Sequence, residues 1–170
     1  MRAARGFTLL EILVVVVIIG VLATLAVLSI GSRSLDDRMA VEARRLHELL
    51  LLAADEAVLQ GTELGFMQTP GGYQFLALRD GQWLALDDSS PLRARPLAPP
   101  LYLELRVDGR RASAQRADPE GGALKPQVLL LSSGDATEFT LDLRAQEYVP
   151  FYRVQGDVLG QMKLERKEPS

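Results

Sequence analysis

The sequence predicts an α+β fold in which one long N-terminal helix packs on an antiparallel, β-sandwich-like domain. Three observations predict this fold. No proline occurs before Pro70, apolar residues recur with helical period up to Ala57, and apolar and polar residues alternate between turn signals after Gly61. The 170 residues are enough for one anchor and one modest domain.

The predicted helix begins with an uncharged stretch. Residues 12–32 include no Asp, Glu, Lys or Arg. As a helix, a run of this length spans roughly 31 Å, enough to cross the apolar core of a bilayer. Arg2 and Arg5 precede it, so by the positive-inside rule the N-terminus faces the cytoplasm and everything after Gly31 is exported. We therefore expect a single-pass transmembrane helix over residues 7–31.

A single carboxylate lies at the edge of this stretch. The chain reads Arg5-Gly6-Phe7-Thr8-Leu9-Leu10-Glu11 immediately before the apolar run. A charge in or beside a membrane span costs roughly 2.5–3.5 kcal/mol on insertion scales. On a helix, Phe7 and Glu11 are four residues apart and share a face. We therefore expect Glu11 to have a function.

This start resembles a type IV prepilin signal, in which a short basic leader ends in glycine and Phe-Thr-Leu-hydrophobic-Glu precedes an apolar helix. The resemblance implies a leader peptide over residues 1–6, cleavage between Gly6 and Phe7 by a prepilin peptidase, and N-methylation of Phe7. It also implies that Glu11 pairs with the Phe7 amine of an adjacent subunit and sets axial register. The alternative is a plain signal anchor. An ordinary secretory signal is cut after its apolar region, and no Ala-x-Ala-like site follows at the right distance.

An amphipathic helix is expected to continue over residues 32–60. Its apolar residues recur every three or four positions: Leu35, Met39, Ala43, Leu46, Leu50, Ala53 and Ala57. This period predicts one face of a helix lying on the domain. Gly61 is expected to end the helix, because glycine accepts the left-handed cap conformation. The whole helix is thus predicted from about Thr8 to Gln60.

The exported domain, residues 61–170, is predicted to be rich in β-strands. Alternating or β-forming runs between Gly, Pro and Asp turn signals predict strands at 62–69, 73–78, 82–86, 101–107, 128–131, 138–143, 147–154 and 158–164. Residues 87–100, with four prolines, and residues 118–126, with a Gly-Gly pair, are predicted to be loops. Residues 167–170 are expected to form a frayed tail.

Composition excludes several classes of site. The chain has no cysteine, so a disulfide framework and a thiolate metal site are both impossible, and it has no asparagine to carry an N-linked glycan. From Gly31 onward there are 17 basic and 21 acidic residues, a net charge of −4. A mildly acidic domain is a poor partner for nucleic acid.

Candidate catalytic or ligand-binding residues are few. His47 is the sole histidine and is expected to be a packing or surface residue, because catalysis needs a nucleophile and an orienting acid beside it. Ser132-Ser133-Gly134-Asp135 lacks the Gly-x-Ser-x-Gly pattern of a nucleophile elbow and predicts a turn that ends a strand. Asp87 and Asp88 are the candidate calcium ligands, but no spaced acidic loop follows them, which favours solvated loop charges.

A loose basic cluster surrounds a predicted hairpin: Arg106, Arg110, Arg111 and Arg116. A cluster of arginines is one way to hold a phosphate backbone. Here Asp108, Asp118 and Glu120 are interspersed with them, which favours a solvated turn.

Two downstream stretches, residues 44–61 and 128–141, resemble the H-type minor pseudopilins of type II secretion. That resemblance implies a structural subunit that is not an enzyme and has no cofactor or metal. Its partners would be other minor and major pseudopilins, the prepilin peptidase and the inner membrane, with the C-terminal domain in the periplasm near the pseudopilus tip. No nucleic acid partner is expected. The alternatives are a DNA-binding minor pilin of a type IV or DNA-uptake pilus, and an anchored periplasmic enzyme, for which no residue set is found.

Overall fold

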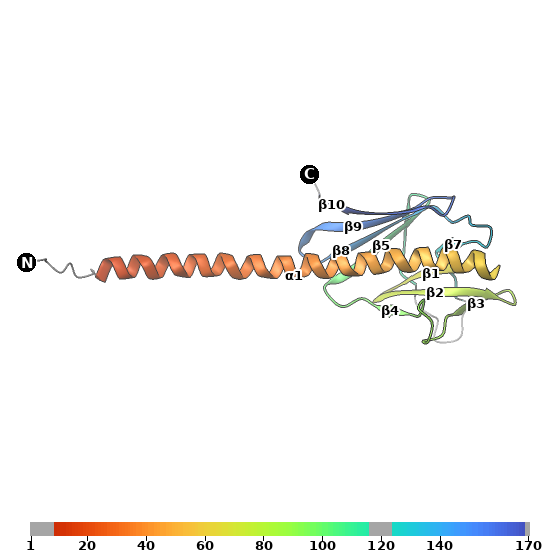
Figure 1. The fold of residues 1–170 in the computed structure, drawn as a ribbon, viewed down its shortest axis with the longest axis horizontal. Coiled ribbons are helices and arrows are strands. Elements are labelled where there is room, and N and C mark those ends of the chain that lie inside the picture. The colour runs from red at the N-terminus through yellow and green to blue at the C-terminus, as the bar shows by residue number, and fades with distance from the viewer. Residues whose placement is uncertain (1–8, 116–123, 169–170) are drawn as a thin grey trace, which may run out of the picture. The chain divides into compact units, whose positions relative to one another are not determined.

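The computed structural model describes residues 9–115 and 124–168 of the chain (Figure 1). The chain divides into two compact units, Met1–Arg38 and Met39–Ser170. Helix α1, Leu9–Gln60, has 52 residues, in agreement with the predicted helix. It contributes residues to both units.

The predicted apolar stripe of α1 is the helix's contribution to the core of the second unit. Met39, Ala43, Leu46, Leu50, Ala53 and Ala57 are all at most 1% exposed. Three of these six are alanines, and short side chains let a helix approach a sheet closely. The helix ends as expected: Gly61 adopts φ +60°, and the amide of Thr62 donates to the carbonyl oxygen of Ala57 at 3.1 Å.

Within the described residues, ten strands form two antiparallel sheets. Sheet A has the order β3-β2-β1-β7, with β4 also paired to β2, and sheet B has the order β10-β9-β8-β5-β6. Sheet A contains β1 (Leu64–Thr69), β2 (Gly72–Arg79), β3 (Gln82–Ala85), β4 (Arg95–Pro96) and β7 (Val128–Leu130). Sheet B contains β5 (Leu101–Val107), β6 (Arg110–Ala112), β8 (Phe139–Ala145), β9 (Tyr148–Gly156) and β10 (Met162–Lys167).

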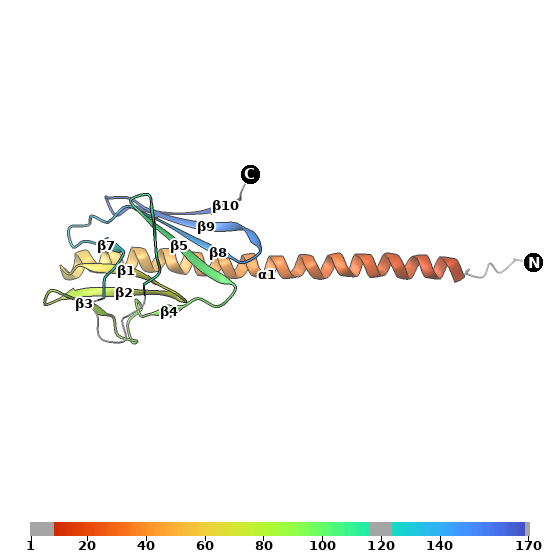
Figure 2. The same ribbon diagram turned by 180° about the vertical axis from the view of Figure 1, so that it is seen from behind.

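The second half of α1 lies over both sheets, with β9 and β10 on one side of its axis and β2 to β4 on the other (Figure 1), and Figure 2 shows the same arrangement from behind. Buried residues from α1 and from both sheets form one hydrophobic cluster. At its centre, the rings of Phe66, Tyr73 and Phe75 lie with centroids 5.6–6.2 Å apart. The Gln68 amide nitrogen donates to the Leu103 carbonyl oxygen at 2.8 Å, which joins sheet A to sheet B.

The predicted strands are found with three differences. The short strand β4 was not predicted and lies within the expected loop at 87–100. Strand β6 is the second strand of the hairpin expected around Arg106 and Arg110, for which no strand bounds were predicted. The strand predicted at 158–164 begins only at Met162. The preceding residues form a turn in which the Asp157 carboxylate accepts hydrogen bonds from the amides of Leu159 and Gln161 at 3.0 and 2.9 Å. Lys167 is not part of a frayed tail, because it ends β10, paired with Phe151 of β9. Most of the loop predicted at 118–126 lies outside the described residues.

Candidate functional site

The sequence-predicted processing and assembly residues lie at the start of the chain. Gly6 and Phe7 are outside the described residues. Glu11 is in the first turn of α1 with an exposed side chain. A carboxylate there is favoured by the helix macrodipole, because the first turn carries the positive end.

The apolar residues that follow Glu11 are exposed around the whole helix. Ten large apolar side chains between Leu10 and Val21 are 42–72% exposed. A helix that is apolar on all sides is one that lipid or other helices cover. Among the described helical residues, no segment meets the length and hydropathy expected of a membrane span.

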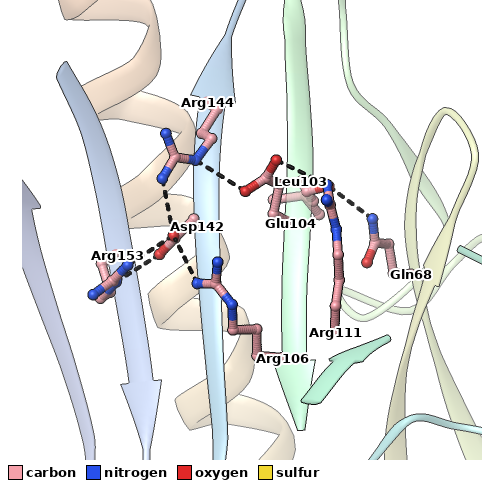
Figure 3. Close-up of polar contacts among 8 residues, drawn as sticks. All are labelled: Gln68, Leu103, Glu104, Arg106, Arg111, Asp142, Arg144 and Arg153. Atoms are coloured by element: carbon pink, nitrogen blue, oxygen red, sulfur yellow. Dashed lines mark hydrogen bonds and ion pairs between the residues drawn. The ribbon is translucent and has the colours of Figure 1, made fainter. Parts of the chain in front are cut away.

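A charge network that sequence reasoning missed lies on the face of sheet B turned away from α1 (Figure 3). At its centre is Asp142 of β8, whose side chain is completely buried. The Arg153 guanidinium donates to both Asp142 oxygens, from Nε at 2.6 Å and from Nη2 at 2.8 Å. Arg144 Nη2 lies 3.4 Å and Arg106 Nη1 3.7 Å from Asp142 Oδ2. Three cations from three strands thus converge on one carboxylate.

Glu104 of β5 extends the same network. Its oxygens lie 2.9 Å from Arg111 Nη2 and 3.2 Å from Arg144 Nε. The Arg144 guanidinium lies over the ring of Phe151, and the guanidinium carbon Cζ is 4.0 Å from the ring centroid. The hydrogen bonds to Asp142 raise the pKa of Arg153 above its ordinary value. Together these residues form the Asp142 network: Glu104, Arg106, Arg111, Asp142, Arg144 and Arg153.

The predicted basic cluster is divided by the structure. Arg106 and Arg111 belong to the Asp142 network, whereas Arg110 is exposed and is adjacent to Arg111 on β6, where successive residues point to opposite faces. Arg116 lies outside the described residues. The solvated-turn interpretation therefore missed the ion pairs that two of these arginines make on the sheet.

Polar side chains also join α1 to the sheets. His47 Nε2 lies 3.4 Å from the carbonyl oxygen of Met162 in β10, so the histidine occupies a packing position. The Tyr73 hydroxyl on β2 donates to Glu42 at 3.2 Å. Burial, followed by the adjacent Glu42 carboxylate, raises the pKa of Tyr73 well above its ordinary value. These groups are used in holding the helix to the domain.

The serine-rich turn is a structural element, as predicted. Glu63, just before β1, accepts hydrogen bonds from the Ser132 amide at 2.7 Å and the Ser132 hydroxyl at 2.9 Å. The Ser133 hydroxyl donates to Asp135 at 2.9 Å, and Gly134 adopts φ +93°. Both serine hydroxyls therefore fix the turn after β7.

Asp87 closes a loop turn by accepting a hydrogen bond from the Ser89 amide at 2.8 Å. That bond is the main reason why the pKa of Asp87 lies below its usual range. In the part of the chain that the structure describes, no three acidic or histidine side chains are grouped in a way that would hold a metal ion.

A cleft of about 570 Å³ lies beside Asp87, between the end of α1 and strand β2. Its polar lining includes Glu56, Gln60 and Arg79, and the Gln60 amide donates to Glu56. Ser90 lines it too, but its hydroxyl accepts from the Leu92 amide at 3.1 Å. The described lining residues contain no histidine, so the cleft offers no imidazole base to activate that hydroxyl.

Comparisons with known proteins agree with this architecture. The family model described as type II transport protein GspH matches residues 42–160, and the prokaryotic N-terminal methylation motif matches residues 1–31. The chain is 38% identical over 152 residues to the type II secretion system protein H of Pseudomonas aeruginosa, covering 84% of each protein. It is 32% identical over 172 residues to the protein of the same name from Aeromonas hydrophila, covering 96% of this chain and 94% of that protein.

A solved structure has the same fold. The crystal structure of the minor pseudopilin EpsH from the type II secretion system of Vibrio cholerae superimposes with a TM-score of 0.64 at 24% identity. The superposition covers 79% of this chain and 98% of the other. A long helix on two antiparallel sheets is therefore an architecture that this chain has in common with a solved protein.

Proposed function

The chain belongs to the GspH family of type II transport proteins and is a minor pseudopilin of type II secretion, and from this premise we propose how it is processed, anchored and assembled. The proposal has three parts, each tied to one segment of the chain. They concern the leader, the exposed apolar part of α1, and the exported domain.

The leader, residues 1–6, is removed by a prepilin peptidase that cuts between Gly6 and Phe7, and the new amine of Phe7 is methylated. The match of the N-terminal methylation motif to residues 1–31 supports this part. The mature chain then begins at Phe7, two positions before α1 begins at Leu9, with a charged terminal amine.

The apolar part of α1 anchors the chain in the inner membrane before assembly. The exposure of the large apolar side chains from Leu10 to Val21 supports this, because a contiguous exposed apolar surface is one that lipid or a partner covers. Inside a filament the helices of neighbouring subunits would cover them instead. Glu11 then pairs with the Phe7 amine of a neighbour, since a carboxylate in apolar surroundings requires a partner.

The exported domain lies in the periplasm and has an assembly role and no enzymatic one. The observation that carries the whole proposal is that α1 is one continuous helix, Leu9–Gln60. Its start has the processing motif, and its second half supplies the core of the β-domain. In that domain, Ser132 and Ser133 are used in a turn, Tyr73 in a contact with α1, and Asp142 in its charge network.

The experiment is complementation of a strain that lacks this chain. Secretion of a type II cargo should return with the wild-type chain, and mass spectrometry should show a mature N-terminus at a methylated Phe7. Gly6→Leu should keep its leader and fail to restore secretion, whereas the matched leader variant Ala4→Leu should be processed. An intact Met1 start in wild-type cells with the peptidase, or a cut near Gly31, would refute the processing proposal.

A further inference from the structure

The outer face of sheet B is basic although the exported part of the chain is acidic. The strand register identifies the side chains that share the face of the Asp142 network, because residues two apart on a strand point to the same side. Its basic residues are Arg106, Arg111, Arg144, Arg153, Lys163 and Lys167, and its acidic residues are Glu104, Asp142 and Glu165. The strand residues of this face therefore have a net charge of +3, against −4 for the chain from Gly31 onward.

The charges on this face are arranged in rows across the strands. Glu104 pairs in register with Asp142, Asp142 with Arg153, and Arg153 with Glu165. All three carboxylates thus lie in one row, and five of the six cations lie in the rows on either side of it. Glu104 and Asp142 hold the four arginines of the face in place, and the arginine side chains remain 25–71% exposed.

Two cations at opposite edges of the face have most of their binding capacity unused. Arg111 on β6 is 71% exposed and gives one nitrogen to Glu104. Lys163 on β10 is 74% exposed and pairs with Glu165 at 2.5 Å. A guanidinium has five N–H donors and an ammonium has three, so each still has donors for a second anion.

The cations between these two edges are pre-ordered. Asp142 holds Arg153 with two hydrogen bonds, and Phe151 supports the guanidiniums of Arg144 and Arg153 at 4.0 and 5.2 Å from its ring centroid. Ordering a long side chain on binding costs about 0.5–1.5 kcal/mol. Much of that cost is already met on this face, so an incoming anion meets cations that are in position.

We propose that the outer face of sheet B is a docking surface for a carboxylate-bearing surface on the exported domain of another pseudopilin, an inference that rests on the proposed function. A protein partner fits better than a nucleic acid, because the exported part of the chain has a net charge of −4 and repels a polyanion. The two most exposed cations, Arg111 and Lys163, also lie on strands at opposite edges of the sheet and are not grouped along one phosphate backbone. Separate carboxylates on a folded partner can instead be placed opposite the flanking cations, which gives specificity as well as attraction.

The test uses the full-length chain in non-ionic detergent, titrated with the purified exported domains of the other minor pseudopilins of the same cell. The test variant Arg111→Glu/Lys163→Glu reverses the two exposed cations. The control variant Arg110→Glu/Arg166→Glu makes the same charge change on one residue each of β6 and β10, both at positions that point to the other side of the sheet. Circular dichroism confirms that both variants fold.

One partner domain is expected to bind the wild-type chain and the control with similar affinity. The test variant should bind at least tenfold more weakly, since reversal replaces attraction by repulsion. Raising the salt concentration should weaken the wild-type complex more than that of the test variant. Recovery of affinity by a Glu→Lys change on the partner would identify the opposing carboxylate.

Equal affinity of the test and control variants for the partner would overturn the inference and leave the proposed function untouched, which the complementation experiment decides separately. The inference would also be overturned if no partner domain bound, or if duplex DNA bound the same face at physiological salt and was released by the same two reversals.

Discussion

Asp142→Asn is the substitution that most directly tests the role of the buried carboxylate. The change keeps the shape of the side chain and removes its charge. It leaves three guanidiniums, with Nε or Nη atoms 2.6–3.7 Å from the former carboxylate, without the anion that holds them together. Because Asp142 has no exposed surface, water cannot replace the lost charge at that position.

The size of the expected loss in stability depends on how deeply Asp142 and its three arginine partners are buried. Removing one partner of a buried ion pair costs about 3–5 kcal/mol. The side chains of Arg153, Arg144 and Arg106 are 25%, 28% and 42% exposed, so solvent reduces their repulsion. The amide oxygen that replaces the carboxylate in this variant also still accepts one hydrogen bond from Arg153. We therefore expect a loss of about 2–3 kcal/mol in the free energy of unfolding, which corresponds to a fall in Tm of about 10 °C.

Urea unfolding of the full-length chain in non-ionic detergent measures this loss. Trp83, the single tryptophan of the chain, lies on β3 of sheet A and reports unfolding by fluorescence, while circular dichroism reports both sheets. Coincident curves would establish one cooperative transition. Glu104→Gln, which removes a carboxylate from a more solvated position, should cost under about 1 kcal/mol. A second change, Arg106→Gln, should recover part of the loss in Asp142→Asn by removing one unopposed cation. If the free energy of unfolding of Asp142→Asn were within about 0.5 kcal/mol of wild type, the buried carboxylate would not be stabilising the domain through its three arginines.

Three further predictions concern other parts of the chain. Glu11→Ala should leave the β-domain folded but reduce crosslinking to other pseudopilins in cells, and unchanged crosslinking would count against its pairing role. Hydrogen bonds from two lysines of β10 lower the pKa of Glu165 from 4.5 to about 2, so the stability that they give is present above pH 4.5 and is lost as the pH falls toward 2. Glu165→Gln should flatten that part of the curve of stability against pH, measured by urea unfolding, and an unchanged slope would contradict this. Gly160→Ala should lower Tm, because φ is +71° and a Cβ would lie 2.5 Å from the Gly134 carbonyl oxygen; a wild-type Tm would show that the two turns can separate at no cost.

The helix and most strands were predictable because their patterns are local. The stripe from Met39 to Ala57 repeats over five turns, and each of its residues is buried as its spacing predicts. Strands β4 and β6 have two and three residues, too few to show a period, and they exist because β2 and β5 supply partners. Val158 and Leu159 were misassigned because apolar residues usually indicate a strand, whereas here they are 56% and 65% exposed at the tip of a turn.

The Asp142 network was not predictable from local pattern. The alternation of residues 140–144 correctly places Asp142 on the face away from the core, where an isolated strand would leave it exposed. Its burial comes from Arg106 on β5 and Arg153 on β9, which reach it only once the register of three strands is set. The usable signal was that the alternating charged residues of 101–107 and 140–144 would share a face if those two strands paired.

Strand β10 forms one edge of sheet B, and four of its six residues are charged. An edge strand offers unpaired amide and carbonyl groups that can template pairing with a strand of another chain, and charged side chains are the usual protection against such aggregation. In the membrane-anchored assembly proposed above, the chain would lie beside related chains, and an unprotected strand edge would be a hazard there. The charged side chains of β10 therefore disfavour pairing of this edge with a strand of another chain, and favour contacts made by side chains.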